Sequence, residues 1–266
     1  MASDRDIVDR LTAAGCVAAE EEAEDLILAA PDAGTLESWV RRREHGEPLP
    51  WIVGFTVFCG RRMRIEPGVF VPRHQTEELA RRASTLLPAG AGRAVDLCTG
   101  AGAVAAHLVA ESPAATVIGV DIDRRAVACA RRNGVNVVLG DLARPLRENA
   151  FDVVTAVAPY VPTAALGLLP VDVQRYEPRR ALDGGEDGLE VVRRVVVAAA
   201  RLLRPGGWLL TELGGEQDVA LAPALAASGF RSVDPWYDED GDLCGVSARA
   251  AARRGPPRSP GAARLP

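Results

Sequence analysis

Apolar residues recur at intervals of three to four positions near the start of the chain. Ile7 and Leu11 belong to this pattern, which is typical of short amphipathic helices. Residues 31–34 (PDAG) interrupt it, and residues 35–38 (TLES) resemble a capped helix start. The pattern therefore predicts a small helical domain over residues 1–47.

The pattern changes at residue 48. Residues 51–58 and 64–65 are rich in β-forming side chains between turn residues, which predicts a short hairpin. Residues 75–87 return to helical spacing, and the Pro- and Gly-rich residues 88–92 predict a loop. We assign residues 48–90 to a hairpin and a linker helix.

Short apolar runs alternate with helical patterns in the remainder of the chain. The expected strands cover residues 94–97, 116–121, 136–139, 152–157, 208–213, 232–237 and 244–248. The expected helices cover residues 103–110, 124–133, 188–203 and 219–228. This alternation predicts an α/β fold with a doubly wound, mostly parallel sheet that ends in an antiparallel hairpin, over residues 91–252. The Gly-, Pro- and Arg-rich residues 253–266 are expected to be a disordered tail.

Composition and charge exclude several classes of protein and of binding site. Of the 266 residues, 48% are hydrophobic and 25% charged, as in ordinary globular proteins, and the net charge of −5 disfavours nucleic-acid partners. The five cysteines are scattered without a C-x-x-C pair, and the three histidines share no ligand spacing, so no metal site is expected. No apolar run approaches a membrane span or a signal sequence, so we expect a cytoplasmic protein. The arginines at positions 41–43 are interpreted as a solvated helix face.

The first candidate for chemistry is the turn after the first strand of the alternating half, residues 96–102 (DLCTGAG). Glycine at positions 100 and 102 lets the backbone approach a ligand at the carboxyl edge of a parallel sheet. The turn differs from the dinucleotide pattern G-x-G-x-x-G because residue 105 is Ala. Alone, it also fits an ordinary turn between a strand and a helix.

Two further strands end in carboxylates. The second strand is apolar until Asp121, about 20 residues after the glycines, which is where a carboxylate binds ribose hydroxyls in nucleotide sites. The third strand is followed by Gly140, Asp141 and Leu142, where Asp141 can meet an adenine amino group. Because the carboxyl ends of parallel strands meet at one edge, the three strand ends predict a site for a nucleoside-containing cofactor.

The Asp-x-x-x-Gly-x-Gly turn, the acid that closes the second strand, the Gly-Asp after the third and the terminal hairpin resemble the class I S-adenosylmethionine-dependent methyltransferases. The resemblance implies an enzyme with a Rossmann-like domain that uses S-adenosyl-L-methionine. It assigns cofactor binding to Asp96, Cys98, Thr99, Gly100, Ala101, Gly102, Asp121, Ile122, Asp141, Leu142 and Val157.

The resemblance narrows over the rest of the chain, which is similar to the HemK-type protein-glutamine methyltransferases over about residues 4–250. Residues 71–79 (VPRHQTEEL) resemble the segment that joins the two domains of that family, where the pattern is close to IPRPETE, with His74 and Gln75 as departures. Further matches are residues 48–54 (PLPWIVG), Phe58, residues 176–178 (YEP), residues 181–189 (ALDGGEDGL), residues 212–214 (ELG) and Gln217. The resemblance implies that the acceptor is the glutamine of a peptide-chain release factor.

The largest departure from the family lies after the fourth strand, where the family has Asn-Pro-Pro-Tyr and this chain has Val-Ala-Pro-Tyr at residues 157–160. In the family, the Asn side chain and nearby carbonyls hold the substrate amide, which is a poor nucleophile unless it is aimed at the methyl group. Val157 offers no side-chain hydrogen bond, and losing one to a buried polar substrate costs on the order of 1–3 kcal/mol. The backbone carbonyls of Val157, Ala158 and Pro159 remain available.

The resemblance assigns catalysis to Pro159, Tyr160 and the Val157 backbone, and acceptor binding to these residues with Ala158. Arg73 is either a loop anchor or a contact that closes the site. We expect direct in-line methyl transfer to a glutamine amide of a protein. Three alternatives stay open: a small-molecule N- or O-methyltransferase of a specialised pathway, favoured by Val157; a nucleic-acid amino-group methyltransferase; and a non-catalytic S-adenosylmethionine-binding paralogue.

Overall fold

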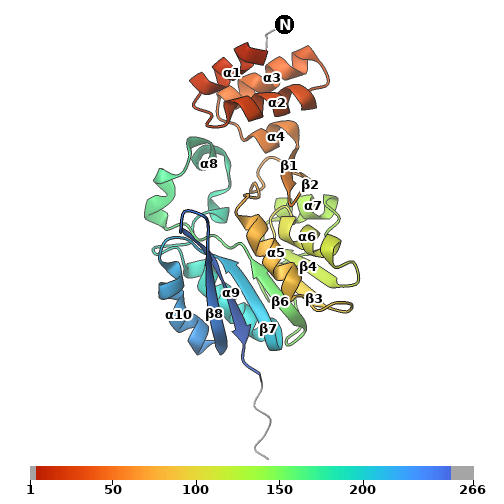
Figure 1. The fold of residues 1–266 in the computed structure, drawn as a ribbon, viewed down its shortest axis with the longest axis vertical. Helices are drawn as coiled ribbons and strands as arrows, with labels where there is room; N and C mark the ends of the chain where they lie inside the picture. Colours follow the sequence, from red (N-terminus) through yellow and green to blue (C-terminus); the bar gives the residue numbers. More distant parts are fainter. Residues whose placement is uncertain (1–3, 253–266) are drawn as a thin grey trace, which may run out of the picture.

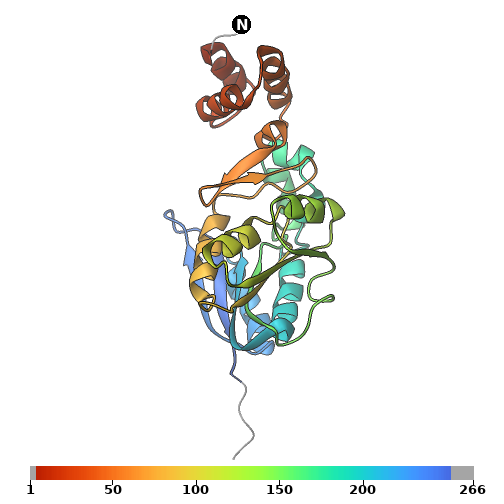
Figure 2. The same ribbon diagram turned by 90° about the vertical axis from the view of Figure 1, so that its right-hand side faces the viewer.

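The computed structural model describes residues 4–252, so the tail expected at residues 253–266 lies outside the described residues. A small helical domain lies at one end of the molecule and a larger α/β domain at the other (Figures 1 and 2). Over the described range, no helix is long and apolar enough to cross a membrane.

The helical domain consists of α1 (Asp4–Ala13), α2 (Ala19–Ala29) and α3 (Ala33–Glu44). Their buried faces meet in a core that includes Ile7 and Leu11, as the helical spacing predicts. Helix α3 begins before the predicted start at residue 35, because the Asp32 side chain caps it by accepting the Thr35 amide over 2.8 Å.

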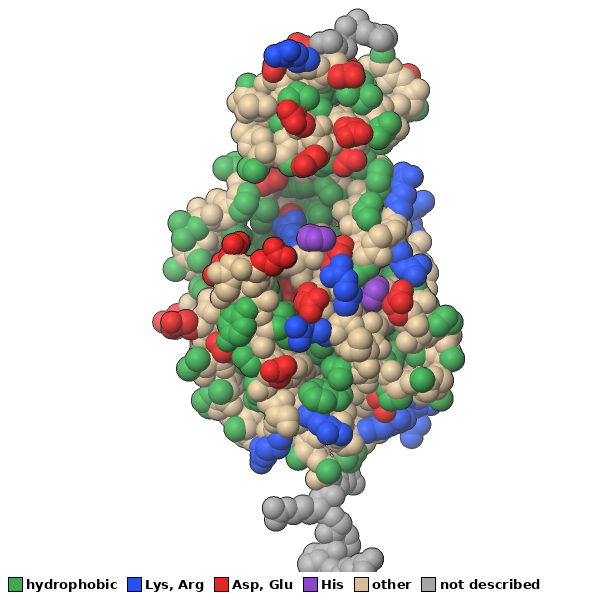
Figure 3. Space-filling view, in the orientation of Figure 1, with side chains coloured by type: hydrophobic (Ala, Val, Ile, Leu, Met, Phe, Trp, Pro, Cys, Tyr) green, Lys and Arg blue, Asp and Glu red, His purple; other side chains and the backbone are tan. Residues whose placement is uncertain are grey.

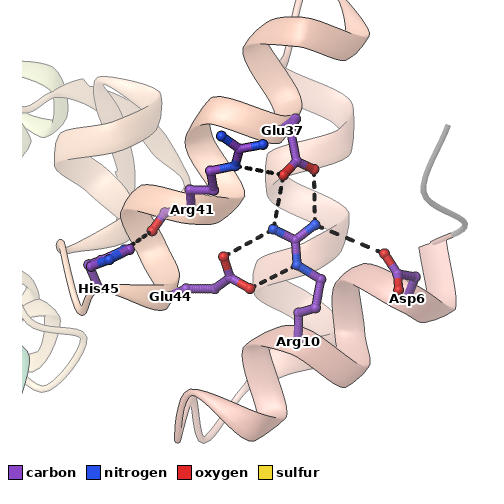
Figure 4. A network of polar contacts seen from close by, with 6 residues as sticks. All are labelled: Asp6, Arg10, Glu37, Arg41, Glu44 and His45. Atoms are coloured by element: carbon purple, nitrogen blue, oxygen red, sulfur yellow. Dashed lines mark hydrogen bonds and ion pairs between the residues drawn. The ribbon is translucent and has the colours of Figure 1, made fainter.

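An ion-pair network on the helical domain joins α1 to α3 (Figure 4). The Arg10 guanidinium donates to Glu37 over 2.9 Å and to Glu44 over 2.8 Å. Hydrogen bonds from Arg10 are the main reason that the pKa values of both glutamates are lowered. Because one guanidinium bridges two carboxylates, the network fixes how α1 lies against α3.

The segment after the helical domain differs from its prediction at one point. Residues 51–53, expected as strand, belong to the short helix α4 (Leu49–Val53), which ends at Gly54 with φ of 82°. The hairpin is shorter than expected and pairs β1 (Phe55–Phe58) with β2 (Arg61–Arg64). Proline near the first turn of α4 and a left-handed glycine after it favour this helical turn over a strand. The linker helix α5 (Thr76–Leu86) follows.

The larger domain contains the predicted doubly wound sheet of seven strands, in the order β5-β4-β3-β6-β7-β9-β8. Neighbouring strands are parallel except that β9 is antiparallel to both β7 and β8, so the predicted terminal hairpin is confirmed. The strands are β3 (Arg93–Leu97), β4 (Thr116–Asp121), β5 (Val137–Leu139), β6 (Phe151–Ala156), β7 (Leu203–Glu212), β8 (Phe230–Tyr237) and β9 (Leu243–Ala250). The strand order reverses between β3 and β6, and ligands of such sheets bind at that crevice.

Alternate residues of the strands send side chains to opposite faces of the sheet. Ala94 and Val153 face a core shared with α5, α6 (Ala103–Glu111) and α7 (Arg124–Arg132). Val95 and Val154 face a second core, shared with α9 (Glu190–Leu202) and α10 (Gln217–Ala227). With both faces covered, only the carboxyl edge of the sheet and the connections above it are left to form a site.

Candidate active site

A pocket of about 260 Å³ lies at the carboxyl ends of β3, β4 and β6, at the predicted edge of the sheet. The residues that line it come from separate turns and include nearly all of the predicted cofactor set. The predicted residues found there are Asp96, Cys98, Thr99, Gly100, Ala101, Asp121, Ile122, Asp141, Leu142, Val157 and Pro159. The fold thus brings together, at the predicted strand ends, residues that lie up to about sixty positions apart in the chain.

The Asp121 carboxylate ties the second strand end to the glycine turn. Its Oδ2 accepts the Gly100 amide and its Oδ1 accepts the Asp123 amide, each over 2.8 Å. Burial raises the pKa of Asp121, and these two backbone donors oppose the rise. Each carboxylate oxygen keeps a lone pair for further donors, such as the hydroxyls of a ribose.

Asp96 lines the pocket but is bound on both oxygens by hydroxyl groups. It accepts Thr99 Oγ1 over 2.5 Å and Thr155 Oγ1 over 2.8 Å, and it is 2% exposed. Burial raises its pKa to about 6, although both hydroxyls act to lower it. The side chain therefore holds the turn between β3 and α6 in place.

Gly102 is the predicted cofactor residue that does not line the pocket. Its φ is 84°, and a Cβ atom there would lie 2.9 Å from Val135 Cγ2 and 3.1 Å from Ala130 Cβ. That Gly102 contacts the ligand stays a prediction, and the structure gives this glycine a role in packing. Glycine is needed because this position combines a left-handed backbone with close packing at the start of α6.

Two arginines in the pocket wall had no signal in the sequence. Arg194 of α9 donates to both oxygens of Asp141 over 2.6 and 2.8 Å. Arg180 lies 3.8 Å from Asp123. Both arginines belong to segments whose pattern indicates only helix or loop, so nothing in their spacing marked them. Asp141 is held by Arg194 at the position expected to border adenine.

A second cavity, of about 970 Å³, lies between the helical domain and the larger domain. Figure 3 shows the surface hollowed between the two. Ala158, Tyr160 and Arg73 line this groove, as do residues of the α1–α2 and α3–α4 connections. Val157 lines both the groove and the pocket, and so marks where they meet.

Arg43 joins the two walls of the groove. It is 8% exposed, and its guanidinium bonds Glu22 of α2 over 2.5 Å and lies 3.8 Å from Asp172 of α8 (Val171–Tyr176), in the larger domain. The interpretation of positions 41–43 as a solvated face is therefore wrong for Arg43. The helical period places it on the inner side of α3, where a buried cation needs acidic partners.

Arg73 is a loop anchor that also lines the groove. Its Nη2 donates to Glu177 Oε1 over 2.6 Å, and the Glu177 side chain is almost fully buried. Burial raises the pKa of Glu177, and Arg73 lowers it. The ion pair connects the segment before α5 to the segment after α8, which both matched the family pattern.

Tyr160 is held from two sides. Its hydroxyl accepts the Gln75 side-chain amide over 2.8 Å, and its carbonyl accepts the Gln217 side-chain amide over 2.8 Å. Burial is the main cause that raises the pKa of the Tyr160 hydroxyl. In the sequence, Gln75 is a departure from the family pattern and Gln217 is a match, and neither feature predicts the contact with Tyr160.

The histidine, cysteine and acidic side chains of residues 4–252 form neither a metal site nor a disulfide. No group of three histidine, cysteine or acidic side chains there is placed to hold a metal ion. All five cysteines are free. Cys98 lies at the end of β3, and burial strongly raises the pKa of its thiol, which is the opposite of what a nucleophilic cysteine requires.

Comparisons with known proteins place the chain in a family. A methyltransferase domain family model matches residues 94–168. A release factor glutamine methyltransferase of Geobacter sulfurreducens is 41% identical over 208 residues, which cover 76% of this chain and 73% of the relative. This chain belongs to the release factor glutamine methyltransferase family. It is accordingly an S-adenosylmethionine-dependent methyltransferase.

A second relative carries out a different named reaction. The 4-amino-L-phenylalanine/4-methylamino-L-phenylalanine methyltransferase of Streptomyces pristinaespiralis is 40% identical over 224 residues, which cover 80% of this chain and 75% of the relative. Among solved structures, a methyltransferase of Pyrococcus furiosus matches with a TM-score of 0.53 and 20% identity, over 73% of this chain and 90% of the other. That likeness supports the fold alone.

Proposed function

We propose that the chain methylates the side-chain nitrogen of a glutamine in a protein, with a peptide-chain release factor as the acceptor. The observation that carries this proposal is the position of Val157, which lines both the cofactor pocket and the interdomain groove. An acceptor that enters the groove meets the pocket at residues 157–160. Methyl transfer depends largely on such alignment, because it needs little acid–base chemistry.

The pocket residues fit S-adenosylmethionine. The open lone pairs of Asp121 suit ribose hydroxyls, and a Cβ added at Gly100 would have nothing within 4 Å, which leaves room there for the methionine part. Asp141 and Leu142 would border the adenine. When bound, the cofactor supplies a methyl group on a positively charged sulfur, which is its own leaving group.

Backbone carbonyls would hold the acceptor amide in place of the missing Asn side chain. The Tyr160 carbonyl already accepts the Gln217 amide, whereas the hydrogen bonds described for residues 4–252 leave the carbonyls of Val157 and Ala158 open. Two carbonyl acceptors suit the two hydrogens of a primary amide. The groove between the domains, at about 970 Å³, is large enough for a loop of polypeptide.

A second candidate is an aromatic amine on a small molecule. Val157 favours it, because an arylamine presents an apolar ring to the junction and needs no amide-binding side chain. The relative that methylates 4-amino-L-phenylalanine also supports an aromatic amine as the acceptor.

Transfer of labelled methyl from S-adenosylmethionine to a panel of acceptors tests both candidates. The panel holds intact release factors, a peptide that contains the acceptor glutamine, and 4-amino-L-phenylalanine. We expect label on the glutamine of an intact release factor, located by mass spectrometry. Label on the amine alone supports the second candidate, and cofactor binding without any labelled acceptor contradicts both.

A further inference from the structure

The side-chain hydroxyl of Thr76 is buried at the start of α5 and is left unsatisfied by the protein. Thr76 is the first residue of that helix and is 3% exposed, and its Oγ1 has no hydrogen-bond partner in residues 4–252. The Thr76 backbone amide does have one, because it donates to the Arg73 carbonyl over 3.1 Å. A buried hydroxyl without a partner is costly, so this one calls for an explanation.

Thr76 differs in position from the other residues that share this property. Within residues 4–252, the other buried side chains with an unpartnered nitrogen or oxygen are His107, Glu177 and Glu212. None of these three lines the cofactor pocket, whereas Thr76 does. The unsatisfied hydroxyl of Thr76 therefore belongs to the wall of a cavity that a polar ligand is expected to fill.

The neighbours of Thr76 place it between the acceptor residues and the glycine turn. The side chain of Gln75, the preceding residue, donates to the Tyr160 hydroxyl over 2.8 Å. Helix α5 also packs against α6 in a core that includes Ala103, and Ala103 lines the pocket directly after the glycine turn. Thr76 thus lies at the end of the pocket at which the methyl group would meet the acceptor.

The part of S-adenosylmethionine expected at this end is its amino acid. In the proposed binding mode, Asp121 binds the ribose, Asp141 borders the adenine, and the methionine part passes Gly100. The methionine part ends in an ammonium group, which donates hydrogen bonds, and a carboxylate, which accepts them. A threonine hydroxyl has one hydrogen to donate and two lone pairs to accept with, so it suits either group.

We propose that the Thr76 hydroxyl hydrogen-bonds the amino-acid end of S-adenosylmethionine and holds the methionine part beside the glycine turn. This inference rests on the proposed position of the cofactor in the pocket, and it is independent of which acceptor is methylated. It also explains why a hydroxyl without a protein partner stands at this position. The same group strengthens cofactor binding and does not stabilise the free protein.

The test measures cofactor binding and stability of Thr76→Val, in which a methyl group of nearly the same size replaces the hydroxyl. Calorimetry with S-adenosylhomocysteine should give an affinity about 10- to 100-fold below that of wild type, because a hydrogen bond to a charged group is lost. Without ligand, the variant should melt at the wild-type temperature or up to about 4 °C above it, because an unsatisfied buried hydroxyl is removed. Thr76→Ser keeps the hydroxyl and should keep most of the affinity.

A ligand without the amino-acid end isolates the proposed contact. 5′-Methylthioadenosine has the adenosine of the cofactor but neither the ammonium group nor the carboxylate, and competition with S-adenosylhomocysteine gives its affinity. We expect wild type and Thr76→Val to bind it equally. Thr85→Val is the matched control, because Thr85 is exposed on the same helix and its hydroxyl donates to the Arg82 carbonyl over 2.8 Å. It should leave both affinities unchanged.

Three results would overturn the proposal. Equal affinities of wild type and Thr76→Val for S-adenosylhomocysteine would show that the hydroxyl does not bind the cofactor. A lower melting temperature of free Thr76→Val would show that the hydroxyl stabilises the fold through a partner within the protein. An equal loss of affinity for 5′-methylthioadenosine would show that the substitution alters the whole pocket.

These measurements use no acceptor, so they separate this proposal from the proposed function. A chain that binds S-adenosylhomocysteine through Thr76 but labels no release factor retains this proposal and loses the other. A wild-type chain that does not bind S-adenosylhomocysteine overturns the cofactor site, and the proposal with it.

Discussion

The Gly100 amide donates a 2.8 Å hydrogen bond to the Asp121 carboxylate, so the glycine turn after β3 and the acidic end of β4 are one structure. A loss of the carboxylate would therefore act twice, on the ligand hydroxyls and on the shape of the turn. Two residues 21 positions apart are fixed by the parallel pairing of β3 with β4, which places both strand ends at the same edge.

Gly102→Ala is expected to destabilise the fold and to weaken cofactor binding. The new Cβ would sit 2.9 Å from Val135 and 3.1 Å from Ala130, at a φ of 84°. The backbone costs about 1–2 kcal/mol and the overpacking about 1–3 kcal/mol. Denaturant unfolding gives the loss, and calorimetry with S-adenosylhomocysteine gives the affinity.

Gly134→Ala is the matched control for that substitution. Gly134 has a φ of 78° but nothing within 4 Å of the added Cβ, so it carries the backbone cost without the clash. Equal losses for the two variants would show that packing at the start of α6 does not require Gly102.

Stability should depend on the protonation of Glu212. Burial raises its pKa from 4.5 to about 7, so the folded state binds this proton more tightly than the unfolded chain. The contribution is fully present below pH 4.5 and is lost as the pH rises through 7. At pH 8, Glu212→Gln should raise the free energy of unfolding relative to wild type, by on the order of 2–3 kcal/mol.

The comparison at pH 5 checks this sign. There the wild-type carboxyl is protonated, so the difference between Glu212→Gln and wild type should shrink. Denaturant curves at both pH values measure it, and a difference that stays constant would mean that Glu212 does not titrate between them.

Arg43→Met should destabilise the chain by about 2–4 kcal/mol, because it leaves Glu22 without its partner at a site where the arginine is 8% exposed. Arg41→Met is the control, since the Arg41 side chain is 69% exposed and should matter little. Thermal unfolding of both variants tests the expectation, and equal melting temperatures would contradict it.

Val157→Asn should improve methylation of a glutamine acceptor, by about tenfold in kcat/KM for one hydrogen bond regained. It should weaken methylation of an aromatic amine, since a polar group then faces an apolar ring. Steady-state kinetics with both acceptors check the two directions. No gain with glutamine would indicate that the acceptor site differs from the family pattern beyond residue 157.

The sequence was most informative where the spacing of apolar residues alone decides the structure. The alternating half predicted the sheet, the terminal hairpin and the strand-end carboxylates, because side chains at parallel strand ends meet whatever the loops do. It failed where tertiary contacts decide. Residues 51–53 are apolar and β-prone but form a helical turn, with Trp51 donating to the Val69 carbonyl over 3.0 Å.

The contacts of the acceptor side could not be predicted in the same way. In the sequence, Arg43 cannot be distinguished from the two arginines before it, because its acidic partners come from α2 and α8. The positions of Arg194 and Glu212 depend on how α9 and β7 lie against loops far away in the chain. No local pattern encodes such distances, and the resemblance to the family supplied only that these segments matter.

Titration calorimetry with S-adenosylhomocysteine tests the central claim most directly, namely that the carboxyl ends of β3, β4, β5 and β6 form the cofactor site. Asp121→Ala removes the carboxylate that holds the Gly100 amide, and Asp234→Ala, an exposed acid on β8, is the control. We predict one site per chain in wild type, a loss of affinity of about 10- to 100-fold in Asp121→Ala, and no change in Asp234→Ala. Equal affinities for wild type and a folded Asp121→Ala would contradict the account.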